Sequence, residues 1–186
     1  MVTAIGPSDA PVPVIETERL RLRAHRADDY ELCQALWSDS EIVRQISARA
    51  ATAEEVWRRL LQYRGLWGLL GYGYWAIEEK ASGQYVGDVG FADFSRDMQP
   101  SLRGMLECGW VLAPQARGMG YATEAVLAVC AWADALGLGQ RAVCIIAPDN
   151  AASIRVATKV GFTSWQQTRY RGSSTLVFRR CSSLGG

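Results

Sequence analysis

Hydrophobic and polar positions alternate in a way that predicts a mixed α/β chain. The stretch LRLRA, which begins at Leu20, alternates apolar and charged residues as a half-buried strand does. Asp28 then opens a helix with apolar residues on one face. Thr52 and Glu55 have the spacing of a capping box at the head of a second helix, which ends at Gly71. The chain therefore starts with one strand and two helices.

Three β-rich segments follow, at residues 72–78, 84–94 and 102–112, and turn residues separate them as in an antiparallel meander. A loop and a helix with apolar residues at helical spacing come next and end near Gly137. The segment 142–146, AVCII, is apolar throughout, which predicts a central strand covered on both faces. A strand, helix, strand order makes this strand parallel to the one before the helix.

The last part of the chain predicts a short helix and a hairpin. The helix follows Asn150 and ends at Gly161, and the two strands lie near residues 162–170 and 174–179, with a turn between them at Arg171-Gly172. The count is then about seven strands and about four helices. We predict an α/β (α+β) fold built on one central sheet.

Length and composition indicate one domain that acts on a small or locally charged ligand. The chain has 186 residues, of which 49% are hydrophobic and 21% charged, with a formal net charge of +1. These values favour neither disorder nor a broad nucleic-acid-binding face. Residues 1–14 contain three prolines among small residues and are expected to form a flexible arm. Residues 15–182 are expected to form the single domain.

Cysteine usage and apolar run lengths point to a reduced, cytoplasmic protein without a metal. The five cysteines are odd in number, form no C-x-x-C, and have only His25 as an imidazole partner. We expect no leader, because no charged and then apolar stretch stands among the first residues, and no apolar run approaches the ~20 residues of a membrane span. We expect no membrane or nucleic-acid partner, and we expect His25 to be exposed near the first strand rather than catalytic.

Two glycines, Gly118 and Gly120, directly precede a helix, where an exposed backbone can bind an anion. A Walker loop would need Gly-Lys-Ser/Thr at this point, whereas the chain has Gly120-Tyr121-Ala122. A dinucleotide fingerprint would need a third small residue at Thr123 and an acidic residue after the next strand, so that interpretation is weak as well. Taken alone, the glycines are equally consistent with a tight turn.

The order of motifs along the chain favours a ligand-binding role for the two glycines over a simple tight turn. Q-x-x-G-x-G-Y-A at residues 115–122 is followed by a helix, a strand, N-x-x-S at residues 150–153, another helix, and G-F at residues 161–162. This order resembles the GNAT N-acetyltransferase family, and within it the RimJ/RimL-like branch, which is related to the enzymes that acetylate the N-termini of ribosomal proteins. The resemblance covers roughly residues 17–180, including the opening TERLRLRAHRADDY and the closing KVGF.

The resemblance implies a mixed sheet that is splayed in the middle, with acetyl-coenzyme A between the strand ending at Leu112 and the strand 142–146. The N–H of Val111 would lie near the thioester carbonyl as an oxyanion donor. Arg117 would assist at a phosphate or remain a solvated loop charge. The residues implied to bind the cofactor are Val111, Leu112, Arg117, Gly118, Met119, Gly120, Tyr121, Ala122, Asn150 and Ser153.

Two residues are candidates for the chemistry, which is attack of an amine on the thioester without a covalent enzyme intermediate. Glu107 lies on the same strand face as Val111, so it is the candidate base; the alternative is a structural carboxylate bonded to a neighbouring strand or to Arg103. Asn150 and Ser153 match positions that contact the pantetheine amide and sulfur, and the alternative for them is helix capping. Relatives often have a tyrosine that acts as general acid at the position of Ala157. This chain lacks it, so the proton for the leaving thiolate would come from Ser153, from a water or from no dedicated group.

The acceptor is not identified by the sequence. Cys108 and Cys144 are expected to be core thiols, and most tryptophans are expected to pack, although four of them (Trp37, Trp67, Trp75 and Trp110) could wall an apolar acceptor site. The leading hypothesis is an acetyl-coenzyme A dependent N-acetyltransferase acting on the primary amine of a protein N-terminus, an amino acid or another small molecule. The alternative is a non-catalytic acyl-coenzyme A binding module. The exposed last hairpin is suited to a homodimer.

Overall fold

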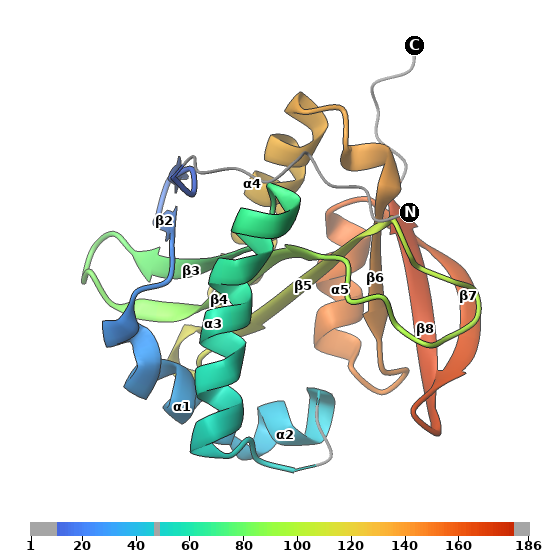
Figure 1. Ribbon diagram of the computed structural model, residues 1–186, viewed down its shortest axis with the longest axis horizontal. Helices are drawn as coiled ribbons and strands as arrows, with labels where there is room; N and C mark the ends of the chain where they lie inside the picture. Colours follow the sequence, from blue (N-terminus) through green and yellow to red (C-terminus); the bar gives the residue numbers. More distant parts are fainter. Residues whose placement is uncertain (1–10, 47–48, 181–186) are drawn as a thin grey trace.

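The computed structural model describes residues 11–46 and 49–180, in which one eight-stranded mixed sheet carries helices on both faces (Figure 1). The strands follow the order β1-β2-β3-β4-β5-β6-β8-β7. Neighbouring strands are antiparallel except β5 and β6, which are parallel. This is the predicted α/β architecture, with one strand and one helix more than the sequence indicated.

The N-terminal part of the chain, up to residue 70, forms two strands and three helices. A 3₁₀ turn at Ala27–Asp29 leads into the first helix. The elements are β1 (Ile15–Glu16), β2 (Leu20–Arg23), α1 (Tyr30–Ser38), α2 (Ser40–Ile46) and α3 (Ala53–Leu70).

Residues 74–180 supply the rest of the sheet and two helices. Short 3₁₀ turns at Pro114–Ala116 and Gly139–Arg141 precede α4 and β6. The elements are β3 (Tyr74–Glu79), β4 (Tyr85–Ala92), β5 (Leu106–Leu112), α4 (Tyr121–Ala135), β6 (Ala142–Ile146), α5 (Ala151–Lys159), β7 (Phe162–Tyr170) and β8 (Ser173–Arg180).

Two elements escaped the sequence analysis because their patterns are short. β1 has two residues and pairs only with β2. α2 has seven residues, and Ile42 is its one buried residue in the part that the structure describes, so it has no apolar stripe to reveal it. The capping box at the head of α3 is confirmed: Thr52 Oγ1 accepts from the N–H of Glu55, and Gly71 ends the helix with φ 75°.

The sheet is splayed between β5 and β6. β5 pairs with β4 from Glu107 to Leu112, but it pairs with β6 only at Leu106↔Ala142 and Glu107↔Val143. The rest of β6 pairs with β8 on its other side. Figure 1 shows the two strands close together at one end and diverging toward the other. Beyond Glu107, the edge of β5 that faces β6 therefore has no strand bonded to it, and we call this opening the gap.

Two layers of helices cover the sheet. α4 packs Val126 and Val129 into the main core, together with inward-facing residues of β2 to β6 such as Val89. On the other face, α1 and α3 pack Leu36 and Leu60 into a second cluster that includes Val111. We call this second side the α1–α3 face.

The N-terminal boundary differs from the prediction. Residues 1–10 of the expected arm lie outside the described residues, as do residues 181 and 182 at the expected end of the domain. Val12 is 9% exposed within the main core, and the carbonyl of Pro13 accepts a hydrogen bond from Trp75 Nε1 at 2.7 Å. Residues 12 and 13 are thus in contact with the sheet. Within the described ranges, none of the helices combines the length and the apolar character of a membrane span.

Candidate active site

The edge of β5 presents backbone groups to the gap. The N–H of Ala113 bonds the carbonyl of Val86 on β4 at 2.9 Å. Opposed residues in an antiparallel pair alternate between exchanging two hydrogen bonds and exchanging none. Val86 and Ala113 form a bonded pair, and the pair of Asp88 with Val111 lies two residues further along, so it is bonded as well and the amide of Val111 points to β4. The amides of Trp110 and Leu112 point the other way, into the gap. The N–H of Val111 therefore points away from the gap, which is the wrong direction for the oxyanion donor expected from the sequence.

The glycine loop lies at the head of α4 beside this edge. Gly118 and Gly120 have φ 77° and 81°, and Gly120 is the N-cap of α4 without a side-chain cap. The first N–H groups of a helix have no partner within it, so amides remain directed outward here. An added Cβ would meet nothing within 4 Å at Gly118. The left-handed backbone, rather than crowding within the protein, explains this glycine.

Arg19 of the N-terminal segment fixes the loop from one side. Its Nη1 donates to the carbonyl of Met119 at 2.8 Å, and its Nε donates to Glu124 on α4 at 2.8 Å. The guanidinium also lies 4.7 Å from the centre of the Tyr121 ring. Thr17 Oγ1 donates to the same Glu124 carboxylate at 2.6 Å. Sequence analysis missed this anchor because nothing near residue 19 indicates a partner 100 residues away.

Arg117 fixes the loop from the other side. Its guanidinium pairs with Asp39 at 2.6 Å and with Glu41 at 2.5 Å, at the junction of α1 and α2. This contact lowers the pKa of Asp39 below its usual value. Arg117 is therefore a bridge between the loop and the α1–α3 face rather than an unpaired loop charge.

Glu107 is buried and ion-paired at the point where β5 and β6 separate. Only 6% of the residue is exposed, and both carboxylate oxygens accept from Arg96 at 2.6 Å. Burial raises the pKa of Glu107, while Arg96 opposes that rise. Arg96 also donates to the Tyr170 hydroxyl at 3.0 Å and so links β5 to the β7–β8 hairpin. From the sequence, Arg103 was a possible partner of Glu107 if the carboxylate were structural. The structure pairs Glu107 with Arg96 instead.

Asn150 and Ser153 lie at the head of α5, directly after β6. Asn150 Oδ1 accepts from the N–H of Ser153 at 3.0 Å, so the capping interpretation of Asn150 is confirmed. Ser153 is half-buried. Ala157 is fully buried one turn later, which leaves a methyl group where many relatives are expected to have a phenol.

His25 was expected to be exposed, and this was wrong. Its side chain is completely buried, and its Nε2 lies 2.8 Å from Oδ1 of Asp88, which is equally buried. Tyr85 donates to the same oxygen at 2.7 Å. Asp88 follows His25 by 63 residues, so only the fold brings the two together.

The tryptophans and cysteines mostly build the core. Trp67, Trp75 and Trp132 pack edge to face with ring centres 4.6 to 5.6 Å apart, so the first two do not wall an open site. Cys108 and Cys144 are free, buried thiols whose pKa values are raised by burial, which fits core thiols better than nucleophiles.

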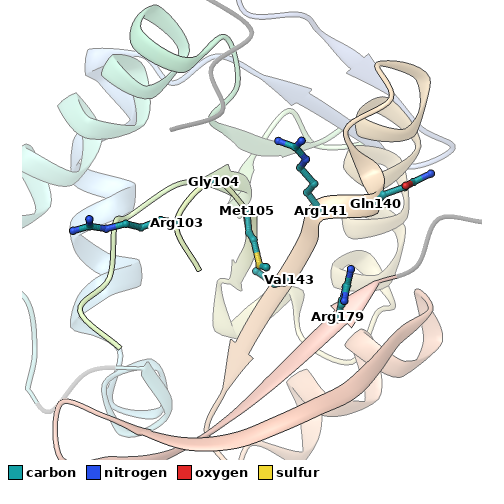
Figure 2. A pocket seen from close by; sticks show the side chains of 7 residues that line it. All are labelled: Arg103, Gly104, Met105, Gln140, Arg141, Val143 and Arg179. Atoms are coloured by element: carbon teal, nitrogen blue, oxygen red, sulfur yellow. The ribbon is translucent and has the colours of Figure 1, made fainter. Parts of the chain in front are cut away.

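Two surface cavities lie outside the gap itself. One of about 330 Å³ lies on the α1–α3 face and reaches Asp39, Tyr85 and Ala113. The other, of about 280 Å³, lies at the paired ends of β5 and β6 (Figure 2). Its arginines extend in different directions in Figure 2, and Arg103 points away from Val143. The described residues contain no cluster of three or more histidine, cysteine or acidic side chains that could hold a metal ion.

Comparisons with known proteins agree with this geometry. YoaA, an uncharacterized N-acetyltransferase of Bacillus subtilis (strain 168), is 28% identical over 156 residues, which are 81% of this chain and 82% of YoaA. A solved GnaT-family acetyltransferase from Bordetella pertussis is 27% identical with a TM-score of 0.80 and covers 91% of this chain and 100% of its own.

More distant structures show the same fold. RimL, a ribosomal L7/L12 alpha-N-protein acetyltransferase solved in complex with coenzyme A, is 17% identical with a TM-score of 0.74 over 93% of this chain and 100% of its own. The family model described as the acetyltransferase (GNAT) domain matches residues 19–163 of this chain. The chain therefore belongs to the GNAT acetyltransferase family.

Proposed function

We propose that this protein transfers an acetyl group from acetyl-coenzyme A to a primary amine by direct attack of the amine on the thioester. The observation that carries the proposal is the gap: an unbonded strand edge, at Trp110 and Leu112, leads directly to a glycine loop at a helix N-terminus. An extended pantetheine arm can bond such an edge as an added strand, and a pyrophosphate suits the helix N-terminus.

The residues at the gap fit this ligand. The exposed amides of residues 118–122 would hold the pyrophosphate, with Arg19 and Arg117 fixing the loop between them. Trp110 and Leu112 would bond the pantetheine arm. Across the gap, Asn150 and Ser153 at the head of α5 would contact its amide and sulfur.

The amine would approach from the α1–α3 face, because the Glu107 side chain lies on the same face of β5 as Val111, which packs there. Glu107 is the carboxylate on that side where β5 and β6 separate. Its burial-raised pKa suits a base that takes a proton from the amine, whereas its pair with Arg96 suits a structural carboxylate. Ser153 would donate a proton to the departing thiolate, directly or through a water.

The acceptor class we propose is the amine of a protein N-terminus, an amino acid or another small molecule. RimL, named for ribosomal L7/L12, and a ribosomal-protein-S5-alanine acetyltransferase from Vibrio fischeri share the fold, which supports testing peptides first. We also propose a cytoplasmic location, supported by four free, buried cysteines. A homodimer through the exposed β7 edge stays a prediction.

The test is an assay of coenzyme A thiol release with peptides that begin with serine or alanine, free amino acids and small amines as acceptors. We expect release that depends on one acceptor class, with calorimetric binding of acetyl-coenzyme A to the free protein. Binding without release in the presence of any acceptor would favour the non-catalytic module instead. Absence of binding would reject both.

A further inference from the structure

Tyr74 lies across two glycines on the α1–α3 face. Tyr74 is opposite Gly90 on β4, and Gly90 is opposite Gly109 on β5, so the three residues form one row across the sheet. A Cβ built on Gly109 would lie 2.1 Å from the Tyr74 hydroxyl oxygen. The missing side chain at Gly109 therefore leaves the space in which this hydroxyl lies.

The ring of Tyr74 is held in place by its neighbours. Tyr63 of α3 stacks on it with ring centres 4.5 Å apart and an interplanar angle of 11°. Phe94 lies next to it with ring centres 6.5 Å apart and an interplanar angle of 47°. A tyrosine packed in this way loses little further freedom when its hydroxyl makes a hydrogen bond.

The Tyr74 hydroxyl lies beside the partly exposed section of β5. Gly109 and Trp110 are half-buried, whereas every other residue of β5 is buried. They lie just beyond Glu107, the last residue of β5 that pairs with β6, and only Cys108 comes between. The Trp110 amide points into the gap within the plane of the sheet, and the Tyr74 hydroxyl approaches the same place from the α1–α3 face.

The hydroxyl is available as a donor. Within residues 11–46 and 49–180, no hydrogen bond of Tyr74 Oη is found. Burial raises its pKa well above the usual value of 10.0, so the group stays protonated at working pH and can donate but cannot serve as a base. The oxygen is not fully enclosed by the described residues, so a ligand can reach it.

We propose that the Tyr74 hydroxyl donates a hydrogen bond to the carbonyl oxygen of the bound thioester, beside the N–H of Trp110, and so forms half of an oxyanion site. This inference rests on the proposed function and adds a catalytic residue to it. As the amine attacks, the carbonyl π electrons move onto the oxygen, and both donors stabilise that charge. The C=O bond then re-forms as the C–S bond breaks, and the thiolate leaves; Tyr74 keeps its proton throughout.

The test follows the carbonyl itself and needs no acceptor. Acetyl-coenzyme A labelled with ¹³C at the carbonyl is bound to the parent, to Tyr74→Phe and to Tyr63→Phe, and the carbonyl stretch is measured by infrared difference spectroscopy. We expect Tyr74→Phe to move the stretch to higher frequency, because one donor is lost. Tyr63→Phe, which removes a hydroxyl from the other ring of the same stack, should leave the stretch unchanged.

A second variant tests whether the position of the Tyr74 hydroxyl matters when the hydroxyl itself is kept. Gly109→Ala displaces the hydroxyl while keeping the tyrosine, so it should move the stretch as Tyr74→Phe does, and the double variant should show no further change. With an acceptor from the panel, Tyr74→Phe should lower turnover by about a hundredfold at unchanged affinity for coenzyme A. An unmoved stretch in bound Tyr74→Phe overturns the inference and leaves the proposed function intact. A parent that does not bind acetyl-coenzyme A overturns both.

Discussion

The proposed cofactor site at the gap and the α1–α3 face above it are built in different ways. Most of the proposed cofactor side comes from one continuous segment, residues 106–122, whose strand, loop and helix follow one another directly, and Asn150 and Ser153 add to it from the head of α5. The α1–α3 face combines residues from β3, β4, α3 and the segment that follows β2, among them Tyr74, Asp88, Tyr63 and His25. A continuous segment carries its geometry in its local sequence, whereas an assembled face depends on the whole fold. The following predictions test whether the two sides also have separate roles.

The largest expected effect concerns the proton on the acceptor side. Glu107→Gln should lower turnover by roughly a hundredfold if the carboxylate acts directly as a base, with affinity for acetyl-coenzyme A little changed. The measurements are steady-state rates across pH and calorimetry of the cofactor. A matched Arg96→Lys variant keeps the carboxylate and a positive charge. Near-normal rates for Glu107→Gln at neutral pH would return Glu107 to a purely structural role.

On the cofactor side, Gly118→Val should weaken acetyl-coenzyme A binding by at least about tenfold, which is roughly 1.4 kcal/mol. The reason is the backbone, because φ at Gly118 is 77° and a β-branched residue disfavours that region. Calorimetry with a circular dichroism check of folding measures the effect. Gly65→Ala in α3, where an added Cβ meets nothing within 4 Å, is the control and should bind normally. Unchanged affinity in folded Gly118→Val would remove the loop from the cofactor site.

Ser153→Ala should have a smaller effect, on the order of a tenfold loss of turnover. A thiolate with a pKa near 8.5 already leaves readily at neutral pH, so a proton donor adds little. The Asn150 cap bonds the backbone N–H of residue 153 and survives the substitution, so cofactor affinity should barely change. Single-turnover transfer across pH is the measurement. A rate equal to that of the parent at every pH would leave Ser153 as a helix-end residue only.

The smallest effect concerns the bridge between the two sides. Arg117 lowers the pKa of Asp39 below 3.8, so the pair stabilises the fold above that pH, and this stability is lost as pH falls through the lowered folded-state pKa. Arg117→Met should cost less than about 1 kcal/mol at neutral pH, because the pair is partly exposed. Urea unfolding at pH 7 and pH 2.5 measures it. A cost that persists in full at pH 2.5 would show that the pair with Asp39 is not its origin.

The same division explains what the sequence could predict. The turn at Gly118 and Gly120, strand β6 and the cap at Asn150 were found because each has a local signature. The Glu107 pair with Arg96 bridges 11 residues and the Arg19 anchor bridges 100, and charge patterns alone do not match such partners. The direction of the Val111 amide was missed for a related reason. It depends on the register between β4 and β5, which alternation along one strand does not determine.

The most direct test of the account is a titration of the isotopically labelled protein with acetyl-coenzyme A, followed through its backbone amide resonances. We predict the largest shifts at Trp110, Leu112 and residues 118–122, with smaller shifts at Val111, whose amide is bonded to β4. Shifts concentrated instead around Arg141 and Arg179, at the cavity on the closed end of the strands, would contradict the assignment of the gap as the cofactor site.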